Sequence, residues 1–86
     1  MDRSGIHKPL STADALGLRP GDEIRVRIGG YRQFRRAVVD GLPRSVEDRY
    51  VVVGYRLRRH DDNTTSRHFH AAVVGSSDEV LRGWSR

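Results

Sequence analysis

Apolar and polar residues alternate along the chain in several short runs, a pattern typical of strands that bury one face. In the first run, Ile24, Val26 and Ile28 share one face, and Arg25 and Arg27 share the other. Successive side chains of a strand point to opposite sides of a sheet, so this run predicts a half-buried strand.

Two more runs predict strands in the middle of the chain. Residues 36–40 have an apolar centre, and residues 41–45 contain a glycine and a proline that end the strand. Residues 50–59 make the longest run, and we expect its inward face to consist of Val51, Val53, Tyr55 and Leu57. Gly54 within this run predicts a bulge or a sharp bend, which a small barrel needs in order to close.

A fourth strand is predicted at residues 67–74, after a polar loop at residues 60–66. We expect its inward face to be formed by Phe69, Ala71 and Val73, and its other face by His68 and His70.

Helical turns are predicted near both ends of the chain. Ser11 is placed to cap a turn that Gly17 ends, and residues 19–22 then form a tight Pro-Gly turn before the first strand. Residues 76–79 have the pattern of a capping box. The turn that this box begins is expected to place three apolar residues against the barrel: Val80, Leu81 and Trp84.

These elements predict an all-β fold, a small barrel of four to five antiparallel strands with a short helical turn near each end. We expect residues 1–10 to form a flexible N-terminal arm and residues 11–86 a single domain. Cysteine is absent, which excludes disulfides and thiol chemistry. The chain shows neither a signal peptide nor an apolar run long enough to span a bilayer, so we expect a cytoplasmic protein without membrane association.

Two segments carry a resemblance to known families. Residues 16–26, Leu-Gly-Leu-Arg-Pro-Gly-Asp-Glu-Ile-Arg-Val, resemble the entry to the first strand of SH3-like barrels of the KOW and FeoA type. They also resemble the middle of AbrB-type swapped-hairpin DNA-binding proteins. Residues 53–59 are similar to a FeoA-type strand, and a further strand follows them where an AbrB-type chain would end. The resemblance therefore favours an SH3-like barrel and implies a binding edge at residues 29–36.

Positive charge is concentrated in the middle of the chain. Residues 24–59 contain ten arginines and three acidic residues, a balance of +7, whereas the segments on either side are each at −1. A clustered positive field attracts polyanions. The excess of arginine over lysine is also what a GC-rich coding sequence produces.

An arginine-rich loop with two aromatic residues follows the first strand. Tyr31 and Phe34 alternate there with Arg32, Arg35 and Arg36. Exposed aromatic rings stack on unpaired bases, and guanidinium groups pair with phosphates. The alternative is that both rings cap the core of a small domain while the arginines are solvated.

The outward positions of two predicted strands also carry arginines. Arg25 and Arg27 would form one basic face with Arg56 and Arg58 if the strands are neighbours. Such a face can position phosphates without reading sequence. Alternatively, the charges keep the sheet soluble and block edge pairing.

The histidines are the candidate ligands for a metal ion. His68 and His70 would lie ~7 Å apart on one strand face, a spacing compatible with a metal, and His7 or His60 could add a ligand. Nothing in the sequence fixes a third ligand, so we expect no metal and no cofactor. We also expect no enzyme, because no serine or threonine lies in a nucleophile-elbow context.

We therefore predict a non-enzymatic module that binds nucleic acid, DNA or RNA. Its expected binding residues are Arg25, Arg27, Tyr31, Arg32, Phe34, Arg35, Arg36, Arg56 and Arg58. The alternative is a protein-interaction or accessory module, in which a strand edge near Val73 and Val74, with Trp84, docks on a partner protein or on a second copy.

Overall fold

The structure is a computed structural model that describes residues 8–59 and 64–83. Within these ranges it forms one helical turn and six strands. In chain order they are α1 (Thr12–Ala15), β1 (Glu23–Arg27), β2 (Arg35–Val39), β3 (Arg44–Val46), β4 (Tyr50–Leu57), β5 (His70–Val74) and β6 (Glu79–Arg82).

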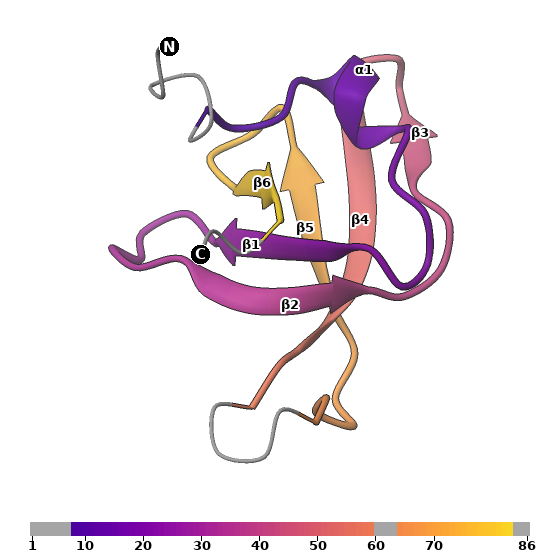
Figure 1. The fold of residues 1–86 in the computed structure, drawn as a ribbon. Helices are drawn as coiled ribbons and strands as arrows, with labels where there is room; N and C mark the ends of the chain where they lie inside the picture. Colours follow the sequence, from indigo (N-terminus) through magenta and orange to yellow (C-terminus); the bar gives the residue numbers. More distant parts are fainter. Residues whose placement is uncertain (1–7, 60–63, 84–86) are drawn as a thin grey trace, which may run out of the picture.

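The strands form one antiparallel sheet that curls into a half-barrel. β1 pairs with β2 on one side and with β6 on the other, and β2 pairs in turn with β4. β4 also pairs with β3 and, along its opposite edge, with β5. Figure 1 shows β1 and β2 running across β4 and β5 at a steep angle, so that the sheet wraps around its own concave side.

The hydrophobic core fills this concave side. Alternate residues of each strand are buried there, as the period of a strand requires. Its fully buried members include Leu18 from the segment after α1, Ile24 from β1, Val51 and Val53 from β4, and Val80 from β6. The predicted all-β class and the inward faces of the first and longest strands are confirmed in this arrangement, with Ile28 and Leu57 only partly buried.

The local signals before β1 are confirmed. The Ser11 hydroxyl accepts a hydrogen bond from the Asp14 amide at 3.1 Å, so Ser11 is the N-cap of α1. In the tight turn that follows, the Asp22 amide donates to the Arg19 carbonyl at 3.0 Å, and Gly21 has a φ of 96°. A positive φ suits glycine because it has no Cβ.

Gly54 lies where β4 changes its partner from β3 to β2. A Cβ at this position would lie 2.8 Å from the Asp40 carbonyl oxygen and 2.5 Å from Cζ of Phe69. The ladder between β4 and β5 continues through Gly54 without a bulge. Of the bulge or sharp bend that the sequence predicted, the bulge is therefore wrong, and the glycine permits close approach of a neighbouring main chain.

The predicted faces of the fourth strand are wrong. In β5, Ala72 and Val74 are buried, Ala71 is exposed, and Phe69 before the strand is 59% exposed. Phe69 lies on the outer side of the sheet, where its ring covers Gly54. Because glycine has no side chain, it leaves room for an aromatic neighbour. Phe69 therefore packs on Gly54 on the outer side of the sheet instead of entering the core.

The predicted C-terminal helical turn is also wrong. Residues 75–77 form a turn, and Glu79–Arg82 is the strand β6, which pairs with β1. β3 was not predicted either, so the described chain has six strands instead of four to five. The contacts of the expected capping box explain the first error, because the Ser76 hydroxyl donates to the Val73 carbonyl at 2.7 Å and Glu79 pairs with Arg27 of β1.

Several predictions fall on residues outside the described ranges, namely those for Trp84, His7, His60 and most of the N-terminal arm. Within the arm, Leu10 packs against the core and its amide donates to the Val80 carbonyl at 2.8 Å. No helix in residues 8–59 and 64–83 is long and apolar enough to cross a membrane.

Candidate functional site

Three arginines stand in one row across the convex face of the sheet. The strand register places Arg25 of β1 directly opposite Arg36 of β2. Arg58, just after β4, continues the row, because its amide donates to the Arg36 carbonyl at 2.9 Å. Their neighbours along the strands, such as Ile24 and Ala37, are buried on the concave side, so the three arginine side chains lie on the convex face, where each is partly exposed. We call this set the arginine row.

Two more of the predicted arginines flank the row and form ion pairs. Arg27 pairs with Glu79, which is its cross-strand partner on β6. Arg56 pairs with Asp40, and its guanidinium also donates to the Arg67 carbonyl at 2.9 Å. These contacts fix the two side chains along the face and partly neutralise its edges.

Phe34 lies on the same convex face, beneath two guanidinium groups. The guanidinium carbon of Arg27 is 4.8 Å from the ring centroid of Phe34, and that of Arg25 is 5.9 Å away. The ring is half-buried and does not belong to the main core cluster. Phe34 is therefore a platform for arginines, which is neither the exposed base-stacking ring nor the core residue that the sequence suggested.

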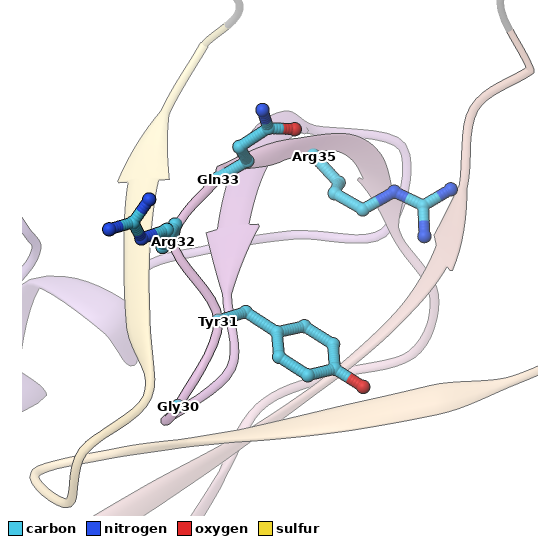
Figure 2. A pocket seen from close by; sticks show the side chains of 5 residues that line it. All are labelled: Gly30, Tyr31, Arg32, Gln33 and Arg35. Carbon is cyan, nitrogen blue, oxygen red and sulfur yellow. The ribbon is translucent and has the colours of Figure 1, made fainter.

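The connection between β1 and β2 carries the other predicted residues. It begins with a tight turn, in which the Tyr31 amide donates to the Ile28 carbonyl at 3.0 Å and Gly30 has a φ of 94°. This turn leaves the Tyr31 side chain 69% exposed. Figure 2 shows Tyr31 and Arg35 projecting to one side of the connection and Arg32 to the other.

Tyr31 and Arg35 stand at the rim of a hollow on the concave side of the sheet. We call it the mouth pocket, and its volume is about 310 Å³. It is lined by Val26, Ile28, Tyr31, Gln33, Arg35, Tyr55, Leu57 and His70. A second, shallower hollow of about 380 Å³ shares Tyr31, Gln33 and Arg35 and adds Arg32.

The wall of the mouth pocket contains two stacked rings. The ring centroids of Tyr55 and His70 are 5.4 Å apart, and the ring planes lie 22° apart. Burial raises the pKa of the Tyr55 hydroxyl, and the negative charge of Asp78 raises it further. The guanidinium of Arg35 acts in the opposite direction and lowers this pKa. Tyr55 thus stays neutral, while Arg35 supplies positive charge at the rim.

The structure divides the predicted binding residues between two surfaces. The convex face has Arg25, Arg27, Phe34, Arg36, Arg56 and Arg58, and the region of the mouth pocket has Tyr31, Arg32 and Arg35. Two ring-bearing residues of the pocket, Tyr55 and His70, were not proposed as a nucleic-acid site from the sequence. Alternation assigned Tyr55 to the core, and only the pairing of Tyr55 with His70 across β4 and β5 brings these rings to the pocket.

Only one of the two histidines lies in a strand of the described chain. His68 precedes β5, and the ring of His70 stacks on Tyr55. In the part of the chain that the structure describes, no group of three or more His, Cys, Asp or Glu side chains is placed to hold a metal ion.

Comparison of the chain with protein-family models, with curated proteins and with solved structures found no match.

Proposed function

We propose that this domain is a non-enzymatic module that binds the phosphate backbone of nucleic acid. The observation that supports it is the arginine row, in which Arg25 and Arg36 lie directly opposite each other on neighbouring strands. Side chains at such positions have Cβ atoms only ~4.5–5.5 Å apart, and like charges there are destabilising. A polyanion that lies across the row would contact more than one of these cations at once.

The flanking groups suit such a ligand. Phe34 holds the guanidinium groups of Arg25 and Arg27 over its ring, so less side-chain entropy is lost when they bind. Guanidinium groups bind phosphate oxygens in a bidentate manner, and contacts of this kind position a nucleic acid without reading its sequence.

We also infer that the half-barrel is an SH3-like barrel module. Its strand order, in which β6 pairs with β1 and β1, β2, β4 and β5 follow one another, supports this assignment. The β1–β2 connection then occupies the place that such barrels commonly use as a binding edge. This analogy concerns the fold and by itself gives no function.

The test is fluorescence anisotropy with a short labelled single strand and its duplex, between about 50 and 200 mM salt. Each phosphate contact on a single strand adds about −0.7 to the slope of log affinity against log salt. The double variant Arg25→Gln/Arg36→Gln should flatten this slope by about 1.4. The matched control is Arg19→Gln/Arg49→Gln, which removes the same charge from two exposed positions outside the row.

An equal loss in the control would show that net charge alone drives binding. Absence of salt-dependent binding, together with dimerisation in solution, would instead favour the alternative of a protein-interaction module. That alternative would use the strand edge near Val73 for docking. The Val73 amide at this edge already has a partner, because it donates to the Asp78 carboxylate.

A further inference from the structure

The mouth pocket has a chemistry that the arginine row does not need. Its floor is apolar, with Val26, Ile28 and Leu57, and its wall holds the stacked rings of Tyr55 and His70. Arg35 stands at the rim, because the register places it opposite Val26 and therefore on the concave side. An apolar floor, aromatic walls and one cation together suit a planar ring attached to an anion.

The size of the pocket limits what can enter. A volume of about 310 Å³ is at the lower end of the ~300–1,000 Å³ typical of ligand pockets. It is suited to a single ring system and is too small for a folded peptide segment. Tyr31, which is 69% exposed beside the opening, offers a further ring face to a planar group that enters.

The surface continues from the pocket along the β1–β2 connection. The second hollow shares Tyr31, Gln33 and Arg35 with the pocket and adds Arg32 on its far side (Figure 2). A detached small molecule needs only the pocket. A chain with an anionic group at every unit would also use the cation beyond it.

We propose that the mouth pocket takes one unpaired base of a single-stranded nucleic acid, with the adjacent phosphate on Arg35. This inference rests on the proposed function and deepens it, because it makes the module selective for single strands. A paired base has both faces covered by its neighbours in the stack and cannot enter without being extruded.

The experiment compares three labelled ligands: oligothymidylate, a fully abasic strand of the same length, and a duplex. The abasic strand keeps the phosphates and lacks the bases, so it reports on phosphate contacts alone. Wild-type protein should bind oligothymidylate more tightly than the other two. Tyr31→Ala should weaken oligothymidylate binding by roughly 5- to 150-fold, and leave the affinity for the abasic strand unchanged.

Leu42→Ala is the matched control, since Leu42 is another exposed apolar residue, at 70%, in a different loop. His70→Ala is a second pocket variant with the same expected selective loss, because His70 is exposed and its removal shortens the stack. Melting curves of all variants establish that each one folds.

The outcomes separate this inference from the proposed function. Equal binding of oligothymidylate and the abasic strand would overturn the pocket while leaving the arginine row intact. The pocket would also be overturned if Tyr31→Ala lost the same affinity for oligothymidylate as for the abasic strand. If thymidine monophosphate competes for the pocket as strongly as the unlabelled strand does, the ligand of the pocket is a free nucleotide and not a strand. Failure of all three ligands to bind would overturn the proposed function itself.

Discussion

His70 stacks on Tyr55 across the β4–β5 ladder, with the two ring planes 22° apart. Tyr55 is 4% exposed, whereas His70 stands on the exposed side of the pair. The pair therefore joins the core to the mouth pocket. It also places the Tyr55 hydroxyl in surroundings that disfavour the charged phenolate.

The first prediction concerns alkaline pH. Burial and then the Asp78 carboxylate raise the pKa of Tyr55 above its usual value of about 10, and Arg35 opposes them. Above that pH the folded state keeps a proton that the unfolded chain has lost. The stabilisation is therefore complete below pH ~10 and is lost as the pH rises through the folded pKa.

Urea unfolding of the wild type and of Tyr55→Phe at several pH values around 10 measures this effect. The difference in unfolding free energy between the two proteins isolates Tyr55 from the other groups that titrate in this range. A difference that does not change with pH would contradict the prediction.

Asp78 supports the second prediction. Its carboxylate accepts the amide hydrogens of Gly29 and Val73, and so ties the end of β1 to β5. Hydrogen bonds to a charged group contribute about 1.5–3 kcal/mol, so Asp78→Ala should lower the unfolding free energy by at least that amount. Asp78→Asn keeps one of the two acceptors and should lose less. If Asp78→Ala and Asp78→Asn lost the same unfolding free energy, the charge of Asp78 would matter and its contact with two amides would not.

The third prediction tests the close approach at Gly54. In Gly54→Ala the new methyl would lie 2.8 Å from the Asp40 carbonyl oxygen, which belongs to the main chain. Overpacking of this kind costs about 1–3 kcal/mol. Removing the Phe69 ring as well, in Gly54→Ala/Phe69→Ala, should recover little, because the carbonyl remains. Gly17→Ala is the control, since a Cβ there meets its nearest atom at an ordinary 3.4 Å.

The fourth prediction distinguishes a platform for arginines from a core residue. Phe34→Ala should lower the unfolding free energy by about 1–2 kcal/mol, because each exposed cation–π contact contributes ~0.5–1 kcal/mol. A core phenylalanine would cost about 3–5 kcal/mol. Chemical unfolding separates these ranges, and Phe34→Leu, which keeps apolar bulk without a π-face, reports the cation–π share. A loss in the larger range would place Phe34 in the core.

Local patterns predicted the elements that local chemistry determines. Alternation located β1 and β4, an apolar run located β2, and the Ser11 cap located α1, because each depends on residues a few positions apart. β3 has three residues and is joined to β4 by residues 47–49, in which Glu47 and Asp48 have φ values of 55° and 54°. Hairpin turns with a positive φ at both central residues are usually marked by Asn-Gly or Asp-Gly, so Glu-Asp here did not indicate a turn.

The remaining errors arose from contacts between distant residues. The face of β5 depends on the fit of Phe69 over Gly54, and the strand character of β6 depends on Asp78 bonding to Gly29. For the candidate site, the sequence indicated the arginines and Tyr31. It could not show that Arg25 and Arg36 are opposed, or that His70 reaches Tyr55, because strand register determines both.

The pairing of β1 with β6 has a consequence for how the chain folds. It joins segments near opposite ends of the described chain, and the pair Arg27 and Glu79 is separated by 52 positions in sequence. Closing so long a loop costs entropy before any contact compensates for it, and folds rich in such pairings form slowly. The hairpins of β1–β2 and β3–β4 can form early, but β1 has an unpaired edge until β6 arrives. During synthesis, that exposed edge would be open to pairing with other chains until nearly the whole domain has been made.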